Sequence, residues 1–298
     1  MKLCAIGALV GSAAFVHFRG RVRHRFLRQL TDHSTLLAPL NALVYALSAV
    51  PARPYLDLSG FPELRPLSDH WQEIRDEAVR LDARDRIRAA AGYVDAGFNS
   101  FFRRGWKRFY LKWYGEPLPS AVERCPRTVA LVEAIPSVRA AMFALLPPGG
   151  TLMRHRDPFA GSLRYHLGLV TPNSDACRIL VDGEPYSWRD GEAVMFDETY
   201  VHEAANDTGT ARIILFCDVE RPLRGSVARR MNRWVGDHLM RATRTRNEEG
   251  EAIGAVNVAF SRVYHVRMLG KRLKAWHRPT YYAVKFGLIA TLLWLFLA

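Results

Sequence analysis

The sequence predicts an α+β protein in which helices precede a jelly-roll β core and an apolar helix lies at each end. Helical periodicity runs from Pro66 to about Gly105, short apolar runs separated by turns follow residue 138, and both termini are strongly apolar. The segments that we expect are a membrane anchor with a basic flank, an interfacial apolar segment, a functional domain, a basic amphipathic region and a second anchor. Their bounds are 1–30, 31–65, 66–222, 223–280 and 281–298.

Composition excludes some classes of protein and places the charge at the ends of the chain. A hydrophobic content of 49% in 298 residues excludes a disordered protein. The net charge of +13 is concentrated in two stretches: 19–28 has five arginines and no acid, and 221–279 has fourteen Lys/Arg against four Asp/Glu. Four widely spaced cysteines predict buried, reduced thiols in a cytosolic compartment rather than a disulfide framework or a Cys-x-x-Cys zinc site. These are Cys4, Cys125, Cys177 and Cys217.

Both termini have the composition of membrane anchors. Residues 3–18, "LCAIGALVGSAAFVHF", and 281–298, "YYAVKFGLIATLLWLFLA", would each form about 27 Å of apolar helix. A cleaved signal peptide is the alternative for the first segment, but its positive charges follow the apolar run instead of preceding it. By the positive-inside rule, we expect both basic flanks and the domain between them to lie on the cytoplasmic side of the membrane.

Two further segments combine apolar and basic or polar residues. The stretch 34–50 contains Pro39 and Asn41, and we expect it to lie in the membrane interface or to pack on the anchors. A predicted helix at 224–243 has arginines on one face and either packs on the domain or binds anionic head groups. Basic patches also suit nucleic acids, but the apolar termini favour a membrane partner and no nucleic acid. The apolar face of this helix carries Val227, Met231, Trp234, Val235 and Leu239.

The predicted domain begins with helices and continues as strands. Ser68, at the start of "SDHWQEIRDEAVRL", is a candidate N-cap, and a second helix is expected at 125–135. Beyond residue 138, the turn sequences "PPGG", "TPNSD", "DGEP", "RDGE" and "NDTGT" separate apolar runs at roughly ten-residue spacing, which is typical of a sandwich or jelly roll. The predicted strands are 139–146, 162–170, 177–181, 192–197, 199–204 and 211–219.

Three side chains in the β region form a candidate metal site. His155 and Asp157 are one residue apart, so on a strand both would project to the same face. His202 follows 45 residues after Asp157, on a late strand of the same core. Two histidines and one carboxylate on one side of a metal leave the opposite positions open, as in non-haem Fe(II) oxygenases.

Arg212 adds a candidate anion site to this cluster. It lies ten residues after His202 and opens the last predicted strand, where a buried guanidinium needs an anionic partner such as a carboxylate. The complete spacing therefore predicts dependence on 2-oxoglutarate. An ordinary surface pair with a separate buried ion pair is one alternative. A zinc hydrolase with the same ligands is another, but it leaves Arg212 unexplained.

The sequences "HRDPFAGSLRYHLGLV" (155–170) and "FDETYVHEAANDTGTARIILFCDV" (196–219) resemble the aspartyl/asparaginyl β-hydroxylase branch of the 2-oxoglutarate dioxygenases over about residues 138–222. The resemblance implies a double-stranded β-helix, the jelly-roll core also found in cupins. It also implies that 66–222 is a dioxygenase domain that uses Fe(II), 2-oxoglutarate and O2. The implied iron ligands are His155, Asp157 and His202. The implied cosubstrate residues are Arg164, His166 and Arg212.

Asp157 separates this chain from part of that branch, since the animal peptide hydroxylase has glycine there. A complete triad with apolar ends is similar to the bacterial lipid A hydroxylases, and residues 17–51 also resemble that subgroup. This similarity implies hydroxylation of a secondary acyl chain of lipid A, or of a related lipid, at its 2-position. The alternatives are a membrane-bound aspartyl/asparaginyl peptide hydroxylase and a non-catalytic membrane scaffold, and the intact ligand set argues against the scaffold.

Several neighbouring residues have two possible roles. Arg154 and Arg156 would point away from the ligands, towards a phosphate or towards solvent. Asp197 and Glu198 would form a turn or support the ligands from behind. Three residues of "GWKRFYLKWYG" would line the cavity entrance or pack in the core; these are Trp106, Lys112 and Trp113.

Overall fold

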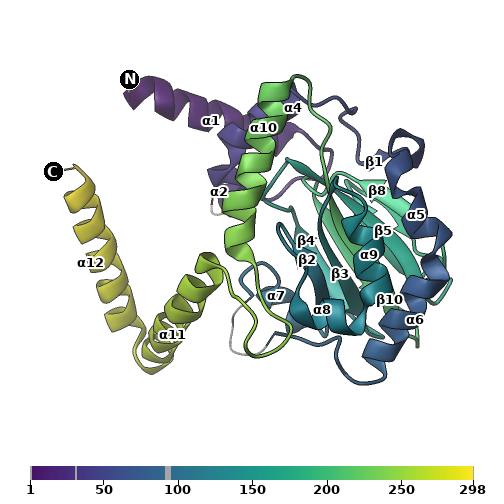
Figure 1. Cartoon of the computed structure of the whole chain (residues 1–298). Coiled ribbons are helices and arrows are strands. Elements are labelled where there is room, and N and C mark those ends of the chain that lie inside the picture. Colours follow the sequence, from purple (N-terminus) through teal and green to yellow (C-terminus); the bar gives the residue numbers. More distant parts are fainter. Residues whose placement is uncertain (1, 31, 91–94, 298) are drawn as a thin grey trace.

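Two antiparallel sheets form the centre of the computed structural model, which describes residues 2–30, 32–90 and 95–297 (Figure 1). The six-stranded sheet has the order β1-β8-β5-β10-β3-β2, and the four-stranded sheet has the order β4-β9-β6-β7. The strands are β1 Tyr55–Leu56, β2 Lys107–Trp113, β3 Val138–Leu146, β4 Thr151–His155, β5 Ser162–Val170, β6 Cys177–Val181, β7 Glu184–Ser187, β8 Ala193–Phe196, β9 His202–Asn206 and β10 Arg212–Glu220.

The path of the chain from β3 to β10 is that of the expected jelly roll. Successive strands cross from one sheet to the other, except for the hairpin of β6 and β7, so that the first and last strands of the series become neighbours. Phe216 on β10 lies opposite Met142 on β3 and His166 on β5, which fixes the register at the centre of the large sheet. The mixed α/β architecture and all six predicted strands are confirmed.

Strand β2 was not predicted, because its "KRFYLKW" sequence mixes charged and apolar residues. Its charges are accommodated individually. Arg108 is buried and pairs with Asp95 at 3.1 Å, and Lys112 reaches Glu133 at the surface. Strands β1 and β7 have two and four residues, too short for any periodicity to show.

Short helices cover the outer face of the large sheet (Figure 1). These are α5 Arg65–Asp69, α6 Trp71–Asp82, α8 Pro119–Arg124 and α9 Pro126–Glu133. In α6, Ile74, Ala78 and Leu81 recur at helical spacing and are buried. The predicted helices are thus present, but Ser68 does not cap α6. It lies inside α5 and its hydroxyl is 3.0 Å from that of Tyr165, whereas α6 begins after His70.

The N-terminal helices pack on one another and on the core. They are α1 Lys2–Phe18, α2 Phe26–Leu30, α3 His33–Leu36 and α4 Ala38–Ala46. α1 packs against α4, where Phe15 and Tyr45 have ring centroids 6.0 Å apart. Of the two alternatives for 34–50, packing on the N-terminal helix is the one observed.

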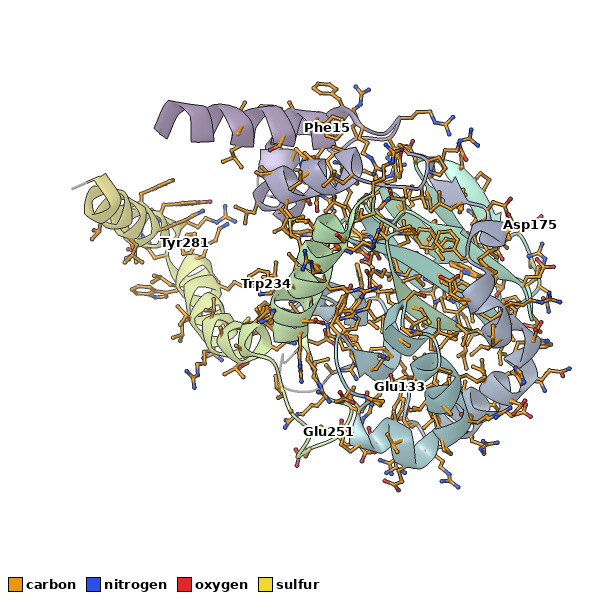
Figure 2. All side chains as sticks on the ribbon, turned by 45° about the horizontal axis from the view of Figure 1, so that its top comes forward. Phe15, Glu133, Asp175, Trp234, Glu251 and Tyr281 are labelled. Carbon is orange, nitrogen blue, oxygen red and sulfur yellow. The ribbon has the colours of Figure 1, made fainter. Side chains whose placement is uncertain are left out.

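Of the C-terminal helices, α10 packs along the core, whereas α11 and α12 project away from it (Figures 1 and 2). The elements of this region are α10 Ser226–Val235, a π-helical turn Gly236–Met240, the 3-10 turn η4 Arg241–Thr243, α11 Ala255–Trp276 and α12 Arg278–Leu297. The apolar face predicted for 224–243 is divided. Val235 is buried with Ala228, whereas Val227 and Trp234 are 70% and 61% exposed. The helix therefore packs by one face and presents apolar side chains to solvent on another.

The expectation of a membrane-spanning helix at each end is not supported. Within the described residues, no helix combines the length and the apolar character needed to cross a membrane. α1 has 17 residues, or about 26 Å, against a hydrocarbon core of about 30 Å. Most side chains beyond residue 288, on which the second anchor was predicted, lie outside the described part.

The expectation of reduced thiols holds for the three cysteines whose side chains are described. Cys125, Cys177 and Cys217 are free and buried. The side chain of Cys4 lies outside the described residues.

Candidate active site

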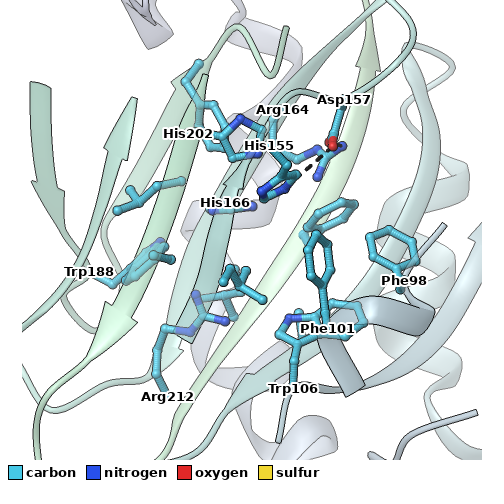
Figure 3. Close-up of a pocket in the computed structure, with 17 residues that line it drawn as sticks. Phe98, Phe101, Trp106, His155, Asp157, Arg164, His166, Trp188, His202 and Arg212 are labelled. Atoms are coloured by element: carbon cyan, nitrogen blue, oxygen red, sulfur yellow. Dashed lines mark hydrogen bonds and ion pairs between the residues drawn. The ribbon is translucent and has the colours of Figure 1, made fainter. Parts of the chain in front are cut away.

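The three predicted metal ligands meet between the two sheets (Figure 3). His155 ends β4 and His202 begins β9, and the antiparallel pairing of these strands places the two residues opposite each other. Their ring centroids are 4.1 Å apart. Together with Asp157, they offer ligand atoms that all lie within 4.8 Å of one another. This spacing suits a single metal ion.

Asp157 reaches the cluster from a loop rather than from a strand. β4 ends at His155, so the expectation that both residues share one strand face is wrong. The backbone N–H of Asp157 donates to the carbonyl of Glu198 at 3.0 Å. This bond ties the loop after β4 to the loop before β9, and so it orients the carboxylate towards the two imidazoles.

Both histidines are held in the tautomer that a metal requires. Nδ1 of His155 lies 2.6 Å from the carbonyl of Met153, and Nδ1 of His202 lies 3.0 Å from that of Tyr200. A carbonyl only accepts, so each Nδ1 carries the proton and each Nε2 keeps its lone pair. Burial lowers the pKa of His155 to about 3 and also lowers that of His202, so both rings are neutral at physiological pH.

Arg164 is surrounded by carboxylates. Its Nη2 is 2.6 Å from Asp157 and also contacts Glu198, and its Nε is 3.0 Å from Asp218. Although burial acts to raise it, the pKa of Asp157 is held well below its usual range by Arg164 and the two histidines. In this geometry Arg164 fixes the carboxylate of Asp157, the candidate metal ligand, while contact between Arg164 and a cosubstrate stays a prediction.

Arg212 lies at the opposite end of the same pocket (Figure 3). It is 1% exposed, and its guanidinium carbon lies 4.3 Å from the ring centroid of Trp188. Burial lowers its pKa to about 10, and no carboxylate pairs with it among the described residues. A buried cation without a counter-ion is costly, so this end of the pocket is built to receive an anion.

His166 lies between these two ends and also has no hydrogen-bond partner. Neither of its ring nitrogens is hydrogen-bonded in the described part of the chain, and burial lowers its pKa well below the usual value. A neutral imidazole can donate one hydrogen bond and accept another. With Arg212, it offers a charge and a hydrogen bond to a small dicarboxylate whose other end reaches the metal ligands, so the residues present fit 2-oxoglutarate.

Apolar side chains form the rest of the pocket wall. Trp106 is 2% exposed and packs in the core, where it forms part of the inner pocket wall rather than of the entrance. Lys112 and Trp113 do not line it: the first reaches Glu133, and the second donates to the hydroxyl of Thr243 at 2.9 Å.

Phe98, Phe101 and Trp188 also line the pocket but were not predicted. The ring centroid of Phe101 lies 4.7 Å from that of His155. Phe98 and Phe101 come from one short helical segment and Trp188 lies 87 residues beyond Phe101, so no sequence spacing marks the three as one wall.

The N-terminal segment supports the ligand loops from outside. Arg156 is buried and donates to the carbonyl of Val16 at 2.8 Å, so the expectation of a solvent-exposed side chain is wrong, while contact with a phosphate stays a prediction. Asp197 is buried between Arg19 and Arg221, at 2.6 and 2.8 Å. Arg154, by contrast, is exposed and pairs with Glu203 at 2.9 Å.

Comparison with known proteins places this site in a family. The family model for aspartyl/asparaginyl beta-hydroxylase matches residues 68–222. An ornithine lipid ester-linked acyl 2-hydroxylase of Rhizobium tropici is 42% identical over 181 residues, which are 60% of this chain and 64% of that protein. The human aspartyl/asparaginyl beta-hydroxylase is 28% identical over 187 residues, 60% of this chain and 24% of that protein. This chain thus spans less than two thirds of either relative.

Among solved structures, a Pseudomonas putida prolyl-4-hydroxylase aligns with 52% of this chain and 87% of its own, at 23% identity and a TM-score of 0.37. The family match covers just over half of the 298 residues and includes the ligand cluster, Arg164, His166 and Arg212. The chain therefore belongs to the aspartyl/asparaginyl beta-hydroxylase family.

Proposed function

We propose that this protein is an Fe(II)- and 2-oxoglutarate-dependent dioxygenase that hydroxylates an acyl chain of a membrane lipid. The observation that carries the proposal is one buried pocket with a two-histidine, one-carboxylate cluster at one end and the unpaired Arg212 at the other. A zinc hydrolase would use the cluster but has no need of a buried cation at that distance. A non-catalytic scaffold would need neither.

Each residue of the pocket has a defined task in this chemistry. Nε2 of His155, Nε2 of His202 and the Asp157 carboxylate would hold the iron, and Arg164 keeps that carboxylate ionised and oriented. Arg212 and His166 would bind the distal carboxylate of 2-oxoglutarate. Bound iron would supply the activation of O2 that allows an unactivated C–H bond to be hydroxylated. The aromatic wall excludes water from the reacting carbon.

Two lipids are candidate substrates. The similarity to lipid A hydroxylases favours the 2-position of a secondary acyl chain of lipid A, at the cytoplasmic face of the bacterial inner membrane. The 42% identity to the Rhizobium tropici protein favours an ester-linked acyl chain of an ornithine lipid. Exposed apolar side chains on α1, α10 and α11 support a membrane-surface partner in both cases. The similarity to the human aspartyl/asparaginyl beta-hydroxylase supports the alternative function, which is hydroxylation of aspartyl or asparaginyl residues in a peptide.

Lipid mass spectrometry tests the substrate. Lipid A and ornithine lipid fractions from cells that express the wild-type protein should contain one acyl chain heavier by one oxygen atom, and cells that express His202→Ala should not. Hydroxylated aspartate or asparagine in peptides, with unchanged lipids, would favour the rival. A reaction that proceeds without 2-oxoglutarate would contradict the proposal as a whole.

The cosubstrate site is tested with the purified enzyme. Arg212→Lys should raise the KM for 2-oxoglutarate about 30- to 1000-fold, because a point charge replaces a bidentate fork in a closed pocket. The matched control is Arg230→Lys on the exposed face of α10. An unchanged KM for the first variant would move the anion site away from Arg212.

A further inference from the structure

A second cleft opens directly outside the metal ligands. It has a volume of about 520 Å³ and shares His155, Asp157 and Phe101 with the inner pocket. Its other walls come from α2 and α3, from residues 96–104, from the loop after β4 and from Thr243. A molecule bound in this cleft would therefore lie beside the ligand cluster while remaining accessible to solvent.

The rim of this cleft is positively charged. Arg28, Arg104 and Arg154 line it and are exposed. The guanidinium of Arg104 contacts only neutral atoms among the described residues, the hydroxyl of Thr151 and the sulfur of Met153, each at 3.1 Å. Arg28 donates to the carbonyl of Arg154 at 2.5 Å, which links two of the rim arginines.

The acids of the cleft are already engaged. Asp32 accepts from the backbone N–H of Ser34 at 3.0 Å and lies 3.9 Å from His24. Asp157 is held by Arg164 and belongs to the metal cluster. Glu203, which pairs with Arg154, is not among the cleft-lining residues. The cleft-lining residues include four arginines, the three of the rim and Arg156, against the carboxylates of Asp32 and Asp157, so the lining carries more positive than negative charge and suits an anion.

We propose that this cleft binds the anionic head group, a phosphate or a carboxylate, of the lipid that is hydroxylated. The proposal rests on the proposed function and identifies what positions its substrate. The 2-carbon of an ester-linked acyl chain adjoins the ester carbonyl, so when that carbon faces the metal, the head-group end of the lipid lies on the same side and the rest of the tail points away. The cleft opens next to His155 and Asp157, where the part of the lipid that joins the ester to the head group would leave the inner pocket.

The surrounding helices agree with a lipid as the occupant. α2 and α3 continue from α1, and Thr243 belongs to η4, which precedes α11. α1 and α11 carry exposed apolar residues such as Phe18, Val266 and Trp276, and both project beyond the core (Figure 1). A lipid that reaches the cleft from a bilayer would pass beside these helices.

Direct binding tests the proposal independently of turnover. The full-length protein, loaded anaerobically with Fe(II) and 2-oxoglutarate, is titrated calorimetrically with short-chain lipids below their critical micelle concentrations. The probes are dihexanoyl phosphatidic acid, dihexanoylglycerol hemisuccinate and uncharged dihexanoylglycerol, and inorganic phosphate is the lipid-free anion. We expect at least one anionic lipid to bind about tenfold or more tightly than dihexanoylglycerol, and the preferred head separates phosphate from carboxylate lipids.

Single substitutions test which arginines of the cleft contribute to the affinity for the anionic lipid. Arg104→Gln and Arg154→Gln should each reduce the affinity for the preferred anionic lipid about 5- to 20-fold, with unchanged affinity for dihexanoylglycerol, and Arg104→Lys should restore most of the loss. Arg84→Gln is the matched control, since Arg84 is exposed in a separate arginine-rich groove that shares no lining residue with the cleft.

Three results of the binding titrations with the wild-type protein would overturn the head-group site. They are equal affinity for charged and uncharged lipids, equal or tighter binding of inorganic phosphate, or tighter binding of a soluble acidic peptide. Losses no larger than that of Arg84→Gln would also overturn it. None of these results concerns 2-oxoglutarate turnover, so the dioxygenase proposal would stand or fail separately.

Discussion

The two ends of this chain resemble each other in sequence but differ in how they are attached. Residues 1–50 and 223–298 both combine apolar helices with many arginines. At the N-terminus, Arg19 enters the core, where it pairs with Asp197 at 2.6 Å and lies 3.9 Å from the ring centroid of Tyr45. At the C-terminus, Asn257 ties the first turn of α11 to the carbonyl of Thr243. Beyond this turn, Trp276 is 80% exposed.

The N-terminal end shows that an arginine-rich flank can be part of a folded core. A guanidinium can be buried when carboxylates and carbonyls satisfy its donors, and the β8–β9 loop provides them for Arg19. Among the described residues, most large apolar side chains that are exposed lie outside the family domain. The exceptions inside 68–222 are Val79, Val122 and Met153. We infer that the N-terminal helices both stabilise the site and present apolar side chains such as Phe18 to an external surface, whereas the C-terminal helices mainly serve that surface.

The largest effect on folding stability is expected when the N-terminal residues are deleted. A separate deletion at the C-terminus serves for comparison. Deleting residues 1–32 should cost several kcal/mol of folding stability or abolish folding, because Asp197 loses Arg19 and Arg156 loses the Val16 carbonyl. Deleting 278–298 should change the free energy of unfolding by about 1 kcal/mol or less. Urea unfolding and Co(II) binding measure both. Similar losses of stability in the two deletion variants would show that the two ends do not differ in how they are attached to the core.

A point substitution isolates the buried pair. Arg19→Met should lower stability by about 2–4 kcal/mol, less than the full cost of breaking a buried pair because Arg221 still contacts Asp197 at 2.8 Å. Arg230→Met, on the exposed face of α10, should change stability by no more than about 0.5 kcal/mol. Equal effects in urea titrations would show that Arg19 has no special role.

The buried His24 of the N-terminal segment should make the folding stability depend on pH. Burial, with the nearby Arg28 charge, lowers the pKa of His24 to about 4. The unfolded chain binds this proton near pH 6.5, so stability is fully present above that pH and falls as pH drops towards 4. In the His24→Gln variant, the urea midpoint should change less with pH between 6.5 and 4 than in the wild type. His238→Gln, on the exposed C-terminal side, should leave this pH dependence unchanged. An unchanged slope in His24→Gln would argue against a buried, neutral imidazole.

The smallest effect on folding is expected at the exposed surface. Replacing Trp234 and Trp276 together with serine should leave stability within about 0.5 kcal/mol, because both side chains are mainly exposed. The same variant should bind vesicles of phosphatidylglycerol and phosphatidylcholine roughly tenfold more weakly, since indoles prefer the bilayer interface. Co-sedimentation with vesicles measures this, and unchanged binding would remove these residues from any membrane surface.

Most of the β core and the composition of the candidate site could be predicted from the sequence. Apolar runs and turn sequences are local signals, so six strands from β3 to β10 could be located, and β4 and β7 were the two not predicted. His155, Asp157, His202 and Arg212 were recognisable because a chemical function restricts residue type as well as spacing.

The partners of the other charged side chains became apparent only from the tertiary structure. Arg164 faces Glu198 and Asp218, Arg156 reaches the N-terminal helix, and Arg19 crosses 178 residues of sequence to Asp197. No local pattern distinguishes these buried arginines from solvent-exposed ones. Their environment depends on which loops meet after the sheets have formed, since a guanidinium is stable in the interior only where distant segments supply its acceptors.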